Sequence, residues 1–138
     1  MDFLEIFIAA IASFALGACW YTFLFGKAWQ AETGITDEQA QQGLAITHGL
    51  AFVMMLVIAF GISYVVHAHA VEDQTFGHGA FHGALFAILI ALPSTAINYL
   101  YQKKSLKLYL IDAGYLLTFF ALQGGGLAAL KLFTEMPG

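Results

Sequence analysis

The sequence predicts an all-α integral membrane protein: an up-down four-helix bundle with a short cytoplasmic helix between spans one and two. Hydrophobic residues make up 60% of the 138 residues and charged residues only 10%, whereas a soluble domain carries about a quarter charged residues. The apolar residues gather into long stretches, and most of the lysines lie between them. Residues 1–138 are therefore expected to form a single four-span transmembrane domain.

The spans are stretches long and apolar enough to cross the hydrocarbon core of a bilayer. They cover about residues 4–25, 46–66, 79–101 and 106–130, close to the roughly 20 residues that a helix needs to cross about 30 Å. They must be helical, because lipid offers no hydrogen-bond partner to an open strand. The short connections between them favour antiparallel neighbours.

The longest connection, about residues 26–45, predicts a short helix of its own. Thr36 and Gln39 have the spacing of a capping box, and Gly43 can end the helix that this box begins. The helix is expected on the cytoplasmic side of the membrane.

The orientation in the membrane is predicted from the lysines. Positive charge is concentrated on the cytoplasmic side of membrane proteins, so the lysine-rich first and third connections are expected to lie inside and both termini outside. The inner lysines are Lys27, Lys103, Lys104 and Lys107, against Lys131 alone on the other side. The acidic residues on the outer side agree: Asp2, Glu5, Glu72, Asp73 and Glu135.

The segment Leu16–Cys19 resembles a lipobox, the cleavage signal of bacterial lipoproteins. However, the chain begins with acidic residues, where a signal peptide needs positive charge, and the apolar run continues past Cys19. We expect the segment to remain as a span, with Cys19 as a small buried apolar residue. An interfacial belt is expected at the cytoplasmic end of this span: Trp20, Tyr21, Lys27 and Trp29.

Two motifs in the sequence are distinctive. The first is GACWY at residues 17–21 followed by LFGKAW at residues 24–29, and the second is KLYLIDAGY at residues 107–115. With these motifs the chain resembles the domain-of-unknown-function 1761 family over nearly its whole length, which implies a small, mostly bacterial, four-span membrane protein. The resemblance implies no activity, substrate or cofactor. We expect a multi-pass protein of the cell inner membrane.

Small residues on spans one and three predict close helix packing, because they let helix backbones approach each other in lipid. These rows are expected to make contacts inside the bundle, although self-association is a fair second hypothesis because four spans have more lateral surface than a small bundle hides. Pro93 is expected to kink span three. The rows at i, i+4 spacing are Ala9, Ser13 and Gly17, and Gly79, Gly83, Ala87, Ala91 and Thr95.

Four histidines flank the connection between spans two and three. His78 and His82 share a helix face, and imidazole pairs of this kind bind zinc, copper or nickel. Glu5 or Asp73 could add an oxygen ligand. The alternative is that these are solvated histidines capping helix ends, since no firm motif such as HExxH is present. The four are His67, His69, His78 and His82.

A tetrapyrrole with one axial histidine is a further alternative at the same place. His82 lies beside Gly79 and Gly83, and small neighbours let a flat macrocycle approach an axial ligand. His48 has Gly49 beside it, but the predicted topology places His48 near the opposite face and excludes a pair with His82.

Asp112 is the only acidic side chain well inside a predicted span, which makes it a default candidate for function. It is expected at the depth of Asn98, on the other arm of the lysine-rich hairpin. It is either a polar clamp between spans one, three and four or a site for a proton or small polar ligand open to the cytoplasm. Its expected partners are Lys27, Lys107, His48 and the Tyr115 hydroxyl. The residues expected to form the ligand site or polar clamp are Trp20, Tyr21, Lys27, His48, Asn98, Asp112 and Tyr115.

The function that the sequence favours is a binding or assembly component that packs with itself or with other membrane subunits. No enzyme is expected, because no nucleophile with an adjacent base, phosphate-binding loop or carboxylate pair is found. Nucleic acid is not an expected partner, because all five basic residues are lysines. The alternatives are an oligomeric transporter or channel-like protein that uses Asp112, or a metal-binding or tetrapyrrole-binding protein.

Overall fold

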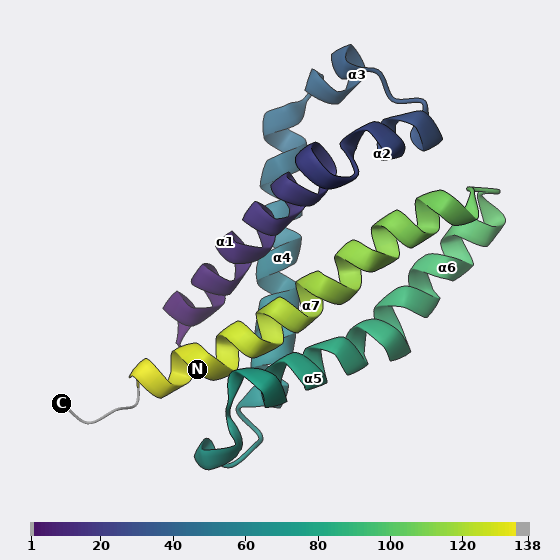
Figure 1. Ribbon diagram of the computed structural model, residues 1–138. Helices are drawn as coiled ribbons and strands as arrows, with labels where there is room; N and C mark the ends of the chain where they lie inside the picture. Colours follow the sequence, from purple (N-terminus) through teal and green to yellow (C-terminus); the bar gives the residue numbers. More distant parts are fainter. Residues whose placement is uncertain (1, 135–138) are drawn as a thin grey trace.

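The computed structural model describes residues 2–134, with side chains described up to residue 130. Within that part of the chain every regular element is helical, and four helices are long and apolar enough to cross a membrane (Figure 1). The predicted all-α fold class is confirmed. These four helices are Phe3–Leu24, Leu44–Val66, Phe76–Tyr101 and Leu106–Leu130.

Two of the spans contain a wider, π-helical turn. Span one is α1 (Phe3–Cys19) followed by the π-helical turn η1 (Trp20–Leu24), and span three is α5 (Phe76–Phe86), the π-helical turn η3 (Ala87–Ala91) and α6 (Leu92–Tyr101). Pro93 lies in the first turn of α6, where a missing N–H is tolerated. The sequence predicted a kink at Pro93, and the structure has instead a π-helical turn, η3, that ends two residues before this proline. Span two is α4 (Leu44–Val66), and span four belongs to α7 (Leu106–Thr134).

The connection between spans one and two contains two short helices, whereas the sequence predicted one. The predicted helix is α3 (Asp37–Gln41), and the Thr36–Gln39 capping box is formed in both directions. The additional helix is α2 (Gly26–Thr33), which ends at Gly34 with a φ of 72°. It contains Lys27 and Trp29, for which the sequence predicted a place in the interfacial belt and no helix.

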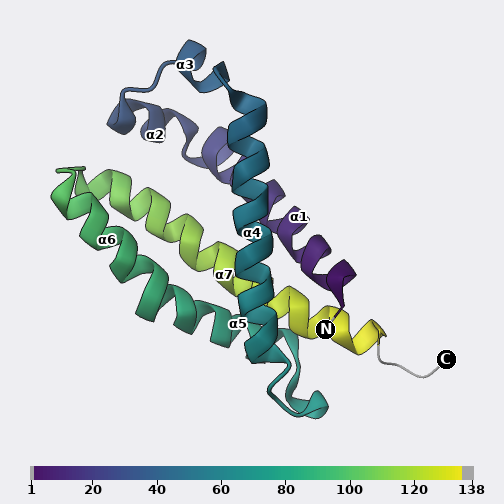
Figure 2. The ribbon, with the colours of Figure 1, turned by 180° about the vertical axis from the view of Figure 1, so that it is seen from behind.

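The helices pack unevenly (Figures 1 and 2). α5 lies closely along α7, α1 contacts both α7 and α4, and α4 crosses near the start of α5 and diverges from α6. The core cluster lies where α1, α4 and α7 meet: Ile6, Ala9, Ala59, Ile62, Val66, Leu127 and Ala128. Many large apolar side chains face outward, as expected for a surface in contact with lipid.

The contact between α5 and α7 is made by backbone against backbone. A Cβ atom added to Gly79 would collide with the carbonyl oxygen of Gly124, and one added to Gly83 with that of Phe120. On α1, Ala9 and Ser13 are buried. The small-residue rows therefore serve packing inside the bundle, as predicted.

The two ends of the bundle differ in chemistry. One end, called the lysine end here, holds α2, α3 and the turn between α6 and α7, and therefore Lys27, Lys103, Lys104 and Lys107. The opposite end, called the histidine end, holds the beginning of α1 and the connection between α4 and α5, with the short helix η2 (Val71–Asp73). The Lys131 side chain and Glu135 lie outside the described residues.

The prediction for Cys19 was wrong. Cys19 is exposed at the end of α1, because the inward positions next to it are taken by Trp20 and Gly17.

Candidate functional site

Three histidines converge at the histidine end. Thr75 caps α5, its hydroxyl accepting from the His78 amide at 3.2 Å. The four-residue spacing of His78 and His82 then places their side chains one turn apart on this helix. His69 comes from the segment after α4. One nitrogen atom from each ring lies within 4.8 Å of the other two, so three of the four predicted histidines are brought together. Metal–nitrogen bonds of about 2.0–2.1 Å require only small ring movements from this arrangement.

The contacts around His69 leave one of its ring nitrogens available as a ligand. Its Nδ1 lies 2.9 Å from the carbonyl oxygen of Val65, and because a carbonyl only accepts, Nδ1 carries the hydrogen in this contact. The lone pair of neutral His69 is then on Nε2. A second ring nitrogen bonded to a backbone carbonyl is typical of metal-binding histidines.

His78 and His82 face each other through their Nε2 atoms, which are 2.8 Å apart. The two rings are stacked, with centroids 4.7 Å apart, and the His69 ring lies 4.5 Å from that of His82. Two nitrogens at this distance either share a hydrogen or bind a common cation. The i, i+4 spacing thus brings the two rings together on one face of α5, as the sequence predicted.

The triad borders a small cavity of about 10 Å³. A water molecule needs about 10–15 Å³ measured in this way, so the enclosed part of this partly open cavity has the size of one water or one small ion. The wall also contains Asp73, one of the two acidic residues considered as oxygen ligands. The full lining is Val66, His69, Asp73, Gln74, His78, Gly79, His82 and Ala128.

His67 does not join the triad, and the prediction of a four-histidine cluster is wrong in this respect. Its Nδ1 lies 2.6 Å from the carbonyl oxygen and 3.0 Å from the hydroxyl of Ser63. That contact turns the ring back along α4. Glu5 is also absent from the cavity wall; it is buried, with 2% of its surface exposed, at the start of α1.

The argument for a tetrapyrrole at His82 fails. Gly79 and Gly83 are buried against the backbone of α7, so the space beside these two small residues is taken by α7 and does not admit a macrocycle. His48 is exposed on α4, with its ring 5.3 Å from that of Phe14, and it belongs to the lysine-end half of that helix.

A second polar cluster surrounds Asp112 at the lysine end. The Tyr21 hydroxyl donates to Oδ1 of Asp112 at 2.6 Å, and the Tyr99 hydroxyl donates to Oδ2. These contacts join η1, α6 and α7. The Tyr115 hydroxyl donates to the Ser13 carbonyl at 3.2 Å, which adds a further link between α7 and α1.

These contacts correct several predictions about Asp112. Its partners are two tyrosines rather than Lys27, Lys107, His48 or Tyr115, and Asn98 is exposed. The aromatic residues after α1 face the bundle: Nε1 of Trp20 donates to the Ile111 carbonyl at 3.0 Å. The polar-clamp interpretation fits this geometry, because both carboxylate oxygens accept a hydrogen bond from another span.

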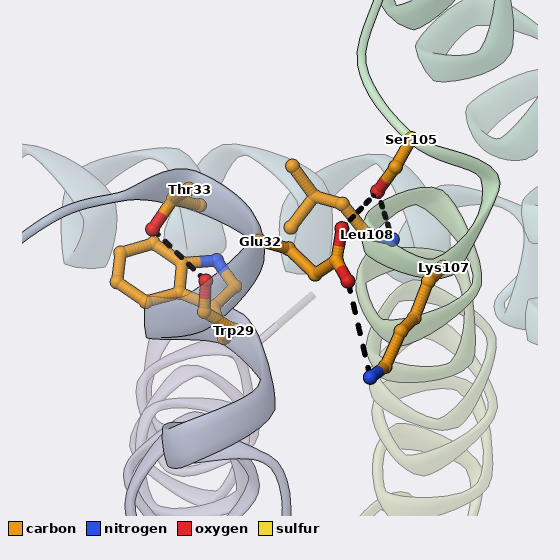
Figure 3. A network of polar contacts seen from close by, with 6 residues as sticks. All are labelled: Trp29, Glu32, Thr33, Ser105, Lys107 and Leu108. Carbon is orange, nitrogen blue, oxygen red and sulfur yellow. Dashed lines mark hydrogen bonds and ion pairs between the residues drawn. The ribbon is translucent and has the colours of Figure 1, made fainter.

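A polar network fastens α2 to the turn between α6 and α7 (Figure 3). The Ser105 hydroxyl donates to Glu32 at 2.5 Å, and the Lys107 ammonium lies 3.8 Å from the same carboxylate. The Ser105 hydroxyl also accepts from the Leu108 amide at 3.1 Å, at the start of α7. Lys107, 65% exposed, therefore serves as a surface ion-pair partner and does not reach Asp112.

Sequence reasoning missed Gln74 and Tyr99. Gln74 is 2% exposed and lines the histidine cavity, but a lone glutamine in a connection carries no motif. Tyr99 was overlooked because its neighbour Asn98 was the polar residue expected at the depth of Asp112.

These observations define a small four-span helical membrane protein with a histidine cluster at one end and a tyrosine–carboxylate clamp at the other. The chain matches the family described as a protein of unknown function, DUF1761, over residues 4–127, and it belongs to that family. No curated protein matches the chain, and no solved structure does.

Proposed function

We propose that this protein is a non-enzymatic binding component of the inner membrane, and that it binds a transition-metal ion through His69, His78 and His82. The observation that carries the proposal is the convergence of one nitrogen from each ring within 4.8 Å. Imidazole suits zinc, copper and nickel. The ion-sized cavity and the carboxylate of Asp73 in its wall support a small cation as the ligand.

We further propose that both termini and the histidine end face away from the cytoplasm. The support is the grouping of four lysines at the opposite end, which the positive-inside rule places in the cytoplasm. The metal would then be taken from the outer side of the membrane.

The test is metal analysis of the full chain, purified without a histidine tag after loading with zinc, copper or nickel. We expect one metal ion per chain, and a loss of at least tenfold in affinity when His78 and His82 are both replaced by alanine. His48→Ala is the matched control, because His48 lies on α4 away from the cavity. A wild-type protein that retains no stoichiometric metal, or an unchanged double variant, would reject the proposal.

Assembly is the second part of the proposal, with a second copy of the chain as the partner. It is supported by the divergence of α4 from α6 and by the large exposed side chains along α4, including Leu50, Met54 and Val57. Cysteine crosslinking at Leu50 or Met54 in native membranes is expected to give a dimer band. Monomer alone at both positions would count against assembly through α4.

The transporter alternative has less support. A proton or ligand site at Asp112 needs a free acceptor, whereas both of its oxygens accept tyrosine hydroxyls. We therefore place Asp112 in the scaffold that holds the bundle together.

A further inference from the structure

We infer that the metal site is open: its fourth coordination position holds an exchangeable water that is hydrogen-bonded to the side-chain oxygen of Gln74. This inference rests on the proposed metal binding by the histidine triad. It specifies that the metal site is open rather than closed, and this decides whether small anions can bind to the metal.

The first step is the orientation of Gln74. Its Nε2 donates to the carbonyl oxygen of His69 at 2.8 Å, and because a carbonyl only accepts, this contact fixes which end of the amide is nitrogen. Nε2 is therefore committed to the backbone of a triad residue, and Oε1 is the free end of the amide.

The second step is the state of that oxygen. Oε1 of Gln74 is buried and has no hydrogen-bond partner among the described residues, and the side chain lines the cavity that His69, His78 and His82 border. A buried acceptor without a donor costs free energy, so an occupant of the cavity that donates a hydrogen bond is favoured. An isolated metal ion cannot donate one, but a metal-bound water can.

The third step is the choice of fourth ligand. An amide oxygen is not among the usual ligands of zinc, whereas three histidines and a water form a common open site. His67 is held by Ser63 and does not reach the cavity. The cavity is partly open to solvent, so a water bound to the metal can exchange and a small anion can take its place.

Asp73 has a different role in this arrangement. It belongs to the exposed η2 turn and lies in the wall of the cavity. We assign it an electrostatic contribution, in which its negative charge favours a cation at the triad without forming a bond to it. This assignment distinguishes the open site from a closed site with three histidines and a carboxylate.

The experiment uses the full chain in lipid nanodiscs, without a histidine tag, freed of metal and titrated with Co²⁺, whose visible absorption reports its ligands. Azide is then added as the exogenous ligand. We expect saturable Co²⁺ binding and a saturable change of the visible bands with azide. Gln74→Ala should strengthen azide binding about fivefold, because the competing water loses one ordinary hydrogen bond.

Gln123→Ala is the matched control. Gln123 is likewise buried with a side-chain oxygen that lacks a partner among the described residues, but it does not line the cavity. Its replacement should leave the azide affinity unchanged. The azide response of the wild-type protein tests the open site even if Gln74→Ala does not fold.

The outcomes separate the two proposals. If Co²⁺ binds but azide does not change its visible bands, the open site is rejected and metal binding stands. The same conclusion follows if Asp73→Asn changes the visible bands of bound Co²⁺ and Gln74→Ala does not. Absence of Co²⁺ binding, together with absence of zinc, copper and nickel, overturns both.

Discussion

Replacing Gly83 by alanine is the sharpest test of how this bundle is held together. Gly83 lies on α5 where it meets α7, and an added Cβ would collide with the Phe120 carbonyl oxygen and lie 2.7 Å from the Phe120 carbonyl carbon. Carbon atoms in good contact are about 3.5–4.0 Å apart. The two helices must therefore separate by about 1 Å, and the obstacle is backbone that cannot rotate aside.

The expected loss of stability follows from this overlap. Inserting a methyl group into a well-packed contact costs about 1–3 kcal/mol. Gly77→Ala is the matched control on the same helix, because nothing lies within 4 Å of its added Cβ and alanine favours a helix by up to about 1 kcal/mol. The free energies of unfolding of the two variants should thus differ by about 1–4 kcal/mol.

The assay is unfolding by sodium dodecyl sulfate in mixed micelles, followed by the fluorescence of Trp20 and Trp29. A Gly83→Ala protein as stable as the Gly77→Ala protein would show that α5 and α7 are not in backbone contact. The proposed packing would then have to be abandoned.

Three further predictions use the same unfolding assay. Asp112→Ala removes the acceptor of two tyrosine hydroxyls, each worth about 1.5–3 kcal/mol, so it should destabilise more than Asp112→Asn; equal losses would contradict the clamp. Lys103→Gly should stabilise by about 1 kcal/mol because Lys103 has a left-handed φ of 57°, and a loss would argue against that turn. Lys107→Met should change the free energy of unfolding by less than about 1 kcal/mol, since the ammonium is mostly exposed. A larger loss would contradict this expectation and show that the ion pair with Glu32 stabilises the fold more than an exposed pair does.

The spans could be predicted from the sequence because lipid imposes one requirement on every residue within them. A helix must be apolar for its full crossing length, and the described spans begin and end within a few residues of those predicted. The close packing along the small-residue rows could also be predicted, because the size of the side chains between two helices sets how near their backbones can approach. The capping box at Thr36 was found for a similar reason, since its geometry is local.

The partners of Asp112 could not be predicted, because they depend on a local change of helical period. A π-helical turn adds one residue to a helix without adding a turn. Tyr21 lies within the π-helical turn η1 (Trp20–Leu24), and Tyr99 follows the π-helical turn η3 (Ala87–Ala91). The direction in which their hydroxyls point toward Asp112 therefore cannot be extrapolated from regular α-helical spacing. Composition gives no signal for such turns.

The histidine triad was only half predictable. The pairing of His78 with His82 follows from helical spacing, whereas the position of His69 depends on how the connection folds back after α4. Its contact with Val65 and the contact of Gln74 with its carbonyl decide that path. Both are contacts between neighbouring parts of an irregular segment, which no periodicity encodes.

The glycine contact between α5 and α7 has a mechanical consequence. Where backbone meets backbone there are no side chains to rearrange, so these two helices behave as one stiff body that carries His78 and His82. The end of α4 packs against this body through Ala59, Ile62 and Val66 and leads into His69, whose ring is bonded to Val65. An ion shared by the three rings would therefore tie the end of α4 and the connection after it to the α5–α7 pair.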